Sequence, residues 1–312
     1  MNLRCSNLLV FFLFFFISLN IFANTDMRWW LMTNGEKVHA ELVVYNPVSR
    51  VAVLRKNELE TEHSIEDFSK ADAAWLIEWA EFSAELDKLS KDIKGEFNHY
   101  QTEGEFACDY YVYTPSKYKK DKNLPLLFLF HPSGKGARYV KRMMLSAESL
   151  SMIIVSSDAF YNTGGVWLKK DDEMLEVFKD LWSTIELEFP HDNSRIYLGG
   201  SSGGAMRAYQ YSGMVDRPWA GIWANGGWLG GPKYYDWNYG KDMRIAMVNG
   251  NHDRGVNRYV DADTKVFEKN GCTVELFSFE GGHSVPTPMI QYKSLLWMLN
   301  IPNPKSLHLE NK

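Results

Sequence analysis

The sequence predicts an α/β protein, a parallel sheet with covering helices, preceded by a small all-β module. From Arg28 to Ile65 apolar and polar residues alternate as in half-exposed strands. After Gly95 short apolar runs alternate with segments of helical spacing. A turn of four glycines and two serines, Gly199-Gly-Ser-Ser-Gly-Gly204, lies between one such strand and a helix. This turn places the candidate site in the α/β part.

The first 23 residues have the pattern of a secretory signal. Arg4 supplies a positive start, Leu8 to Phe22 is almost entirely apolar, and Ile21-Phe22-Ala23 resembles a signal-peptidase site. Cleavage after Ala23 would leave a secreted or periplasmic chain with no membrane span. An uncleaved anchor is the alternative, although the apolar run is short for a spanning helix.

Composition and charge restrict the class of partner. The chain is 45% hydrophobic and 14% aromatic, which is enough to form a sizeable core. Its net charge is −5, and no basic block stands out. A nucleic-acid partner is therefore not expected.

A small all-β module is expected at residues 27–68. Apolar residues occupy every second position from Val38 to Val44 and continue at Val51 and Val53 after a turn at Asn46-Pro47. With Arg28-Trp-Trp30 and Gly35, this pattern resembles the SLA-homology module, a small barrel of the Src-homology-3 type. The resemblance implies a peptide ligand for the barrel, and a purely structural appendage is the alternative.

Residues 69–95 are predicted to form an amphipathic linker helix. Ser69 and Asp72 provide a start that is similar to a capping box. Large apolar residues then follow at helical spacing, namely Trp75, Trp79, Phe82, Leu86 and Leu89.

The α/β part is predicted to cover residues 96–302, followed by a polar tail at 303–312. An amphipathic helix is expected from around Asp171 to Phe189. Strands are expected at Tyr110–Tyr113, Leu124–Phe130, Met152–Val155, Arg195–Leu198, Gly221–Ala224, Arg244–Val248 and Thr273–Phe279, and Leu124–Phe130 is expected to be buried.

The glycine-serine turn matches the nucleophile-elbow pattern G-x-S-x-G twice, centred on Ser201 and on Ser202. Small residues are required on both sides of the nucleophile because the turn is sharp. For Ser201 the positions two before, two after and three after are all glycine, whereas for Ser202 the last is alanine. We therefore expect Ser201 to be the nucleophile and the amide of Ser202 to be an oxyanion donor. Ser202 remains the alternative nucleophile.

A serine nucleophile needs a histidine base and an acid that orients this base. His283 follows the last strand in a glycine-rich loop, and Asp253 follows the preceding strand. The sequence therefore predicts Ser201, Asp253 and His283 as a catalytic triad. His252 is expected to be a pocket wall or polar loop surface, and His308 lies in the polar tail.

The loop after Leu126–Phe130 reads His131-Pro-Ser-Gly-Lys-Gly136. Its small residues allow a substrate carbonyl to approach the backbone. We expect Ser133 to be the second oxyanion donor, with Gly134 as the alternate, and His131 to contact substrate. A plain turn rich in proline and glycine is the competing interpretation.

Five aromatic residues lie between Trp228 and Tyr239. Trp228 and Trp237 are predicted to bind substrate, because aromatic faces stack on sugar rings or phenolic groups. Packing of this segment onto the core is the alternative.

Taken together, these motifs resemble the alpha/beta-hydrolases, and among them the secreted polyhydroxybutyrate-depolymerase and feruloyl-esterase type. The motifs that carry the resemblance are His131-Pro-x-Gly134, the glycine-serine turn, Gly250-x-x-Asp253 and Gly281-Gly-His283. The resemblance implies a mostly parallel eight-stranded sheet, ester hydrolysis through an acyl-enzyme, and no cofactor or metal. It also implies that Cys108 and Cys272 lie toward opposite sheet edges, so both are expected to be free thiols.

The sequence therefore predicts a serine carboxylic-ester hydrolase acting on a small-molecule or polysaccharide-linked ester. A serine peptidase on the same fold is one alternative. A non-catalytic surface protein that binds a partner through the N-terminal barrel is the other.

Overall fold

The computed structural model describes residues 28–77, 79–80, 93–120, 123–160, 162–163, 166–167 and 171–301. The predicted signal at residues 1–23, much of the predicted helix at 69–95 and the tail at 303–312 lie outside these ranges. Within them, no helix combines the length and apolar character needed to span a membrane.

The N-terminal part is a four-stranded antiparallel sheet, β1-β2-β3-β4. Its strands are β1 (Arg28–Leu31), β2 (Lys37–Asn46), β3 (Val51–Lys56) and β4 (Leu59–Ser64). Alternate residues point into a small core that contains Trp30, Leu42 and Leu54. The antiparallel strands agree with the sequence-based prediction. The predicted closed barrel is not shown, since no pairing joins β1 to β4 in the described residues.

A helix follows this sheet and packs back onto it. Residues 70–77 and 79–80 are helical, and Ser69 Oγ accepts a 3.2 Å hydrogen bond from the Asp72 N–H, as the cap prediction requires. Trp75 meets Trp30 edge-on, with ring centroids 5.4 Å apart. The Arg28 guanidinium lies over both rings and donates to Asp72 at 2.6 Å.

The large sheet has eight strands in the order β14-β13-β12-β11-β7-β8-β6-β5. These are β5 (Glu96–Gln101), β6 (Asp109–Thr114), β7 (Leu126–Phe130), β8 (Ile153–Ser157), β11 (Ile196–Ser201), β12 (Gly221–Asn225), β13 (Arg244–Gly250) and β14 (Thr273–Phe279). All strand pairs are parallel except β5 with β6 and β6 with β8. The number of strands and their direction agree with the prediction. β5 was not predicted, because its residues are mostly polar and partly exposed.

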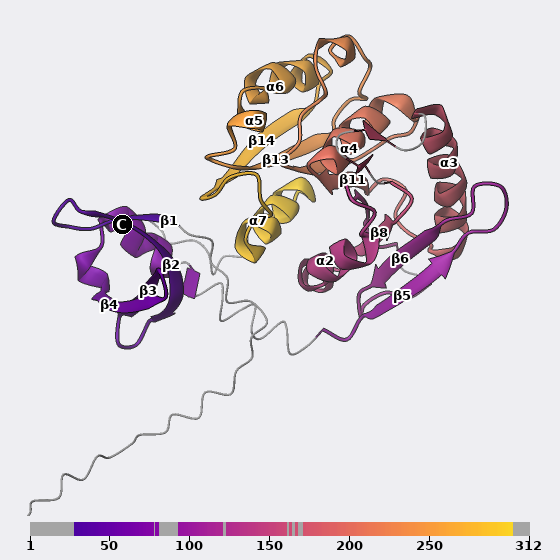
Figure 1. The fold of residues 1–312 in the computed structure, drawn as a ribbon. Helices are drawn as coiled ribbons and strands as arrows, with labels where there is room; N and C mark the ends of the chain where they lie inside the picture. Colours follow the sequence, from indigo (N-terminus) through magenta and orange to yellow (C-terminus); the bar gives the residue numbers. More distant parts are fainter. Residues whose placement is uncertain are drawn as a thin grey trace, which may run out of the picture.

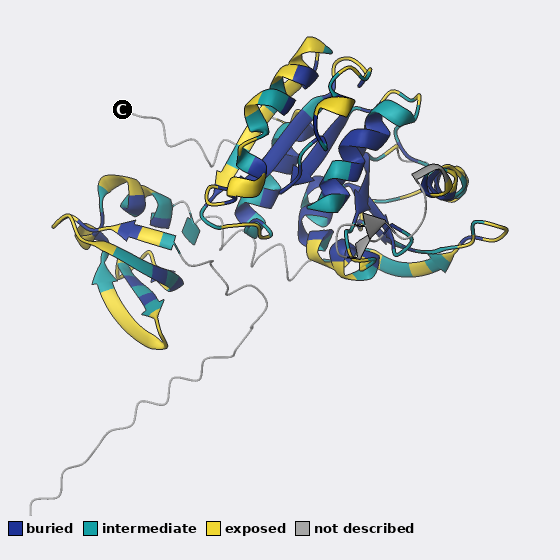
Figure 2. Cartoon of the chain, turned by 45° about the horizontal axis from the view of Figure 1, so that its top comes forward, coloured by how far each residue is buried: buried dark blue, intermediate teal, exposed yellow. Residues whose placement is uncertain are grey.

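Helices cover both faces of this sheet (Figure 1). On one face lie α2 (Gly136–Leu150) and α7 (Pro288–Met298), and on the other lie α3 (Asp171–Glu188), α4 (Gly203–Met214) and α6 (Val260–Lys269). The central strands β7, β8, β11, β12 and β13 are almost entirely buried, whereas the edge strands β5 and β14 are largely exposed or half-exposed (Figure 2). The shorter elements are η1 (Ile65–Asp67), β9 (Asn162–Thr163), β10 (Val166–Trp167), η2 (Pro232–Tyr234) and α5 (Arg254–Asn257).

The two cysteines of the described residues lie at opposite ends of the sheet order. Cys108 directly precedes β6, and Cys272 directly precedes β14. Both are free thiols, in agreement with the prediction. Burial raises the pKa of the Cys272 thiol to about 11, so this thiol stays protonated at neutral pH.

Candidate active site

The glycine-serine turn joins β11 to α4 at the carboxyl edge of the sheet. Ser201 is the last residue of β11, and Gly203 is the first of α4. Ser202 between them has φ 53° and ψ −123°, a combination that side-chain-bearing residues rarely adopt. A Cβ at Gly204 would overlap the Phe130 carbonyl, so glycine is required where α4 passes the end of β7. Strand, strained serine and helix together form a nucleophile elbow.

Ser202 lies at one end of a chain of three side chains. Its Oγ is 2.8 Å from His283 Nε2, and His283 Nδ1 is 2.6 Å from Asp253 Oδ2. An ionised carboxylate can only accept hydrogen bonds, so Nδ1 carries the proton and Nε2 is left to accept from Ser202. Asp253 is 5% exposed and His283 is 49% exposed. The Asp253 carboxylate is therefore buried, whereas the His283 imidazole is half-exposed to solvent.

The expectation that Ser201 is the nucleophile is corrected by this geometry, which brings Ser202 to His283. Successive strand residues face opposite sides of a sheet. As the last strand residue, Ser201 turns toward the α2 face, where its Oγ donates to Asn225 Oδ1 at 2.9 Å. Tyr139 of α2 is buried beside it. Counting from the strand side of the turn selects Ser202, the serine that lies next to His283, whereas the glycine pattern favours Ser201.

The acid and the base are positioned by two loops at the same sheet edge. Asp253 caps α5, where Oδ1 accepts a 3.3 Å hydrogen bond from Val256 N–H. Gly226, with φ +58°, lies beneath the pair, and a Cβ there would be 3.2 Å from His283 Cε1. Sequence reasoning missed both Gly226 and its neighbour Asn225, although Asn-Gly-Gly directly after a buried strand is a strong turn signal.

The expected oxyanion donors also need correction. The Ser202 N–H donates to the Asn225 carbonyl at 2.8 Å, so it is not available. With Ser202 as the nucleophile, the next amide belongs to Gly203, in the first turn of α4, where N–H groups have no intrahelical partner. The Ser133 N–H donates to His131 Nδ1 at 3.0 Å and is likewise occupied. The Gly134 N–H makes only a 3.5 Å contact with the His131 carbonyl.

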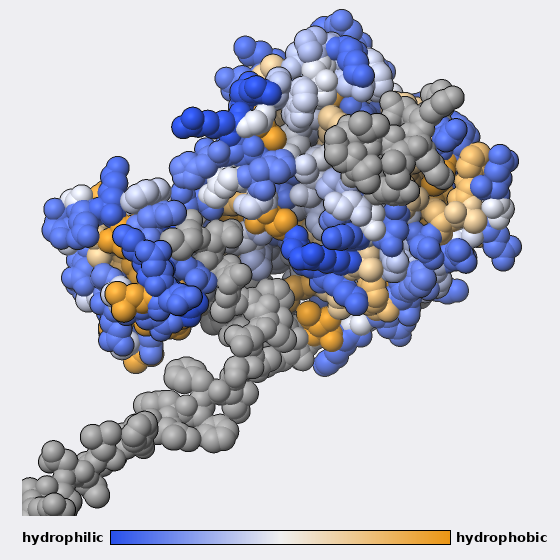
Figure 3. Space-filling model, viewed as in Figure 1, coloured by the Kyte–Doolittle hydropathy of each residue, from blue (hydrophilic) through white to orange (hydrophobic). Residues whose placement is uncertain are grey.

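His131 organises its own loop. Its Nδ1 accepts from the backbone N–H groups of Ser133 and Lys135, and its ring meets Tyr139 edge-on at 5.4 Å. Burial lowers the pKa of His131 to about 4, helped by the cations Lys135, Arg142 and Arg138. The ring is therefore neutral at pH 7. Figure 3 shows strongly hydrophilic side chains on the surface over α2.

The aromatic segment after β12 divides into two parts. The Trp228 ring is half-buried and stacks on Tyr259 at 4.1 Å, in the loop that follows the buried Gly226-Gly227. Trp237 instead packs beside Gly213, which is 213 − 202 = 11 residues from Ser202 along α4. At 1.5 Å per residue that is about 16 Å. The prediction that Trp237 contacts substrate is therefore corrected to core packing.

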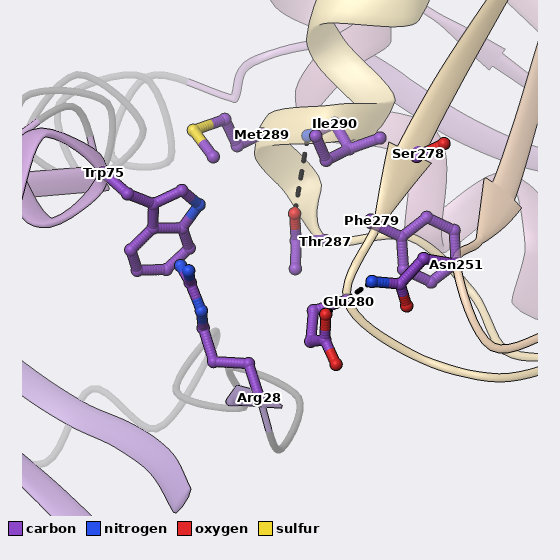
Figure 4. A pocket seen from close by; sticks show the side chains of 9 residues that line it. All are labelled: Arg28, Trp75, Asn251, Ser278, Phe279, Glu280, Thr287, Met289 and Ile290. Atoms are coloured by element: carbon purple, nitrogen blue, oxygen red, sulfur yellow. Dashed lines mark hydrogen bonds between the residues drawn. The ribbon is translucent and has the colours of Figure 1, made fainter. Parts of the chain in front are cut away.

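The loop that contains His283 is anchored at its first residue, Glu280, by polar contacts with the loop after β13. Glu280 accepts from Asn251 Nδ2 at 2.5 Å and lies 2.7 Å from His252 Nε2. His252 is thus polar loop surface, one of the two outcomes expected for it. A cavity of about 210 Å³ separates this loop and the start of α7 from Arg28 and Trp75 of the N-terminal part (Figure 4). The same close-up shows Glu280 turned toward Asn251.

No protein-family model and no curated protein matches this sequence. Solved structures match it over about two thirds of its length. An S-formylglutathione hydrolase from Agrobacterium tumefaciens has a TM-score of 0.53 at 13% identity, covering 68% of this chain and 97% of that one. A fluorophosphonate-binding serine hydrolase of Staphylococcus aureus has 0.51 at 11% identity, covering 66% and 99%. A ferulic acid esterase from Anaeromyces mucronatus has 0.50 at 13% identity, covering 67% and 92%.

These similarities are structural, and they establish the fold. The large sheet with its covering helices has the fold of these esterases and serine hydrolases. At the carboxyl edge of this sheet a serine, a histidine and an aspartate are connected by two consecutive hydrogen bonds.

Proposed function

We propose that the protein is a serine carboxylic-ester hydrolase that acts through an acyl-enzyme. The observation that carries this proposal is the continuous Ser202–His283–Asp253 hydrogen-bond chain on a strained elbow. A nucleophile, a base within reach of its proton and an acid that orients the base are the parts that acyl transfer requires.

In the first half of the reaction, Ser202 Oγ attacks the ester carbonyl and its proton passes to His283 Nε2. Asp253 stabilises the imidazolium through Nδ1 without taking the proton itself. The N–H of Gly203 donates to the developing oxyanion, and Gly134 supplies the second donor. The tetrahedral intermediate then collapses, the alcohol leaves with the proton from His283, and the acyl group stays on Ser202.

In the second half, water replaces the alcohol. His283 Nε2 takes a proton from the attacking water, and the same donors stabilise the second oxyanion. Collapse of this intermediate returns the proton to Ser202 Oγ and releases the carboxylic acid. The net reaction is ester plus water to acid plus alcohol, with no cofactor consumed.

The substrate is proposed to be a small-molecule or polysaccharide-linked ester that meets the enzyme outside the cell. The half-buried Trp228 offers a π face for a sugar ring or a phenolic acyl group. His131 lines the neighbouring loop with an uncharged ring, and the N-terminal module is proposed to take a peptide ligand. Secretion is proposed from the signal-like pattern of the first 23 residues.

Fluorophosphonate labelling followed by peptide mapping tests this proposal, because the probe reacts with an activated serine. The expected result is one phosphonylated residue, Ser202, with labelling abolished in Ser202→Ala and strongly slowed in His283→Ala. Ser201→Ala is the matched control and should still be labelled. A wild-type chain that stays unlabelled, while a known serine hydrolase in the same tube reacts, would reject the serine-hydrolase proposal.

A further inference from the structure

We propose that Asn225 is a positioning residue, which holds His283 in line with Ser202, and that Ser201 keeps the Asn225 amide in its working orientation. This inference rests on the proposed function, since it assigns a role in the same site. It begins with the question of why the elbow contains a second serine.

Asn225 is the last residue of β12 and is fully buried. Its side chain makes three hydrogen bonds to three different segments. Oδ1 accepts from Ser201 Oγ at 2.9 Å, and Nδ2 donates to the carbonyls of Val248 and Ser284, each at 3.1 Å. One amide therefore joins the end of β11, the end of β13 and the loop beyond His283.

The orientation of this amide follows from its partners. The carbonyls of Val248 and Ser284 can only accept, so both must face the NH₂ group. The amide oxygen is then left for Ser201, whose hydroxyl can donate. A reversed amide would set three oxygens against one another in a buried site, which is costly. Ser201 thus completes the only arrangement that satisfies every group.

The backbone of the same residue contacts the nucleophile. The Asn225 carbonyl accepts from the Ser202 N–H at 2.8 Å and so supports the strained conformation of Ser202. The side chain meanwhile holds the carbonyl of Ser284, directly after His283. Asn225 is therefore a short connection between the residue that carries the nucleophile and the loop that carries the base.

A buried residue cannot touch substrate, so its effect should fall on the reaction step rather than on binding. Displacement of a reacting group by about 1 Å can cost on the order of 100-fold in rate. Loss of the Ser284 contact frees the loop on the side of His283 that the Glu280–Asn251 pair does not hold.

The experiment compares four variants, each assayed well below its melting temperature. Asn225→Ala removes all three side-chain bonds. Asn225→Asp keeps the size and the bond from Ser201 but cannot donate to two carbonyls when ionised. Ser201→Ala removes only one bond. Asn249→Ala is the matched control, since Asn249 is equally buried on β13 and its amide has no hydrogen-bond partner in the described residues.

Two readouts are measured. On a short-chain aryl ester, kcat should fall by about 10- to 100-fold in both Asn225 variants and by less than about tenfold in Ser201→Ala, with KM nearly constant. The proton of the short Asp253–His283 hydrogen bond should give a far-downfield NMR resonance. We expect this resonance to be present in wild type and Asn249→Ala and to be lost or broadened in Asn225→Ala.

A kcat within twofold of wild type in Asn225→Ala, with the resonance retained, would overturn the proposal. An equal loss in Asn249→Ala would also overturn it, because general destabilisation would then explain the effect. If Asn225→Ala does not fold, Asn225→Asp decides by the same criteria. If fluorophosphonate does not label the wild-type protein, the proposed function is rejected. If the resonance is nevertheless lost in Asn225→Ala, the positioning role stands.

Discussion

Two layers of side chains lie at the carboxyl edge of the large sheet, and they differ in almost every physical respect. The outer layer, Ser202 and His283 with Asp253 behind them, reaches solvent through a histidine that is 49% exposed. The inner layer, Ser201, Asn225 and Tyr139, lies between the sheet and α2, and Asn225 is 0% exposed. Adjacent serines therefore have opposite surroundings. The difference teaches that backbone conformation, rather than residue type, decides which hydroxyl meets the base.

The largest effects are expected when each of the two serine hydroxyls is removed in turn, which tests the difference between the two layers directly. Ser202→Ala should lower kcat on a short-chain aryl ester by several orders of magnitude, up to ~10⁶ if the triad acts as a unit. Ser201→Ala should keep turnover within about tenfold, because it removes only the bond to Asn225. Steady-state kinetics on the two variants checks this expectation. The reverse ranking would return the nucleophile to Ser201.

A second test concerns Gly226, which lies next to His283 and Asp253 in the outer layer. Gly226→Ala should lower kcat by about 10- to 100-fold, because the new Cβ would lie 3.2 Å from His283 and displace it. The variant should also lose about 1–2 kcal/mol of unfolding free energy from its positive φ.

Gly240→Ala is the matched control for that test. Gly240 has φ +70°, but a Cβ added there would meet nothing within 4 Å, so the same backbone penalty arises without a clash. We expect similar losses of stability in the two variants by urea unfolding and a loss of kcat in Gly226→Ala alone. Equal kcat values would contradict a steric role for Gly226.

The two tryptophans of the aromatic segment give a smaller contrast. Trp228→Ala should raise KM for an aromatic ester several-fold, because the stacked indole is proposed to line the substrate site. Trp237→Ala should leave KM unchanged and cost about 1–3 kcal/mol of stability, because it packs behind α4. Kinetics and thermal unfolding of both variants measure this. A rise in KM for Trp237→Ala alone would reverse the assignment.

The smallest expected effect is a pH dependence at His131. Its pKa is about 4 in the folded protein, whereas an unfolded histidine titrates near about 6.5. Between these values only the unfolded chain binds the proton, so the neutral ring's contribution to stability is full above pH ~6.5 and is lost as pH falls to ~4.

His131→Asn should remove this component, since an amide oxygen can still accept from the Ser133 N–H but does not titrate. Urea unfolding at several pH values should show wild type losing more stability than the variant as pH falls from neutral toward 4. Parallel curves for the two proteins would contradict the lowered pKa.

Most of the fold was predictable from the sequence because its signals are local. Short continuous apolar runs such as Leu126–Phe130 are typical of buried strands in a sheet covered on both faces, and this run forms such a strand. The order of strands and loops along the chain is enough to bring Asp253 and His283 to one sheet edge. β5 escaped prediction because it pairs on one side only and remains polar.

The errors within the site share a different cause. Residue type and position in the chain favour Ser201, Ser133 and the Ser202 amide, yet the hydrogen bonds of the folded chain, both local and long-range, decide which of these groups is free. The Asn225 carbonyl accepts a hydrogen bond from the Ser202 N–H, and the His131 ring accepts one from the Ser133 N–H. The position of Trp237 could not be predicted, because the sequence does not show that its segment packs against the C-terminal part of α4, away from Ser202.

The backbone of Ser202 also limits how stable this protein can become. With φ 53° and ψ −123°, the position suits glycine better than any residue that bears a side chain. Repeated selection for thermal resistance alone would therefore favour Ser202→Gly, which relaxes the elbow and removes the hydroxyl. On the proposed function the most stable sequence of this fold would therefore be an inactive one, and it would differ from the active sequence at the residue that contacts His283 Nε2.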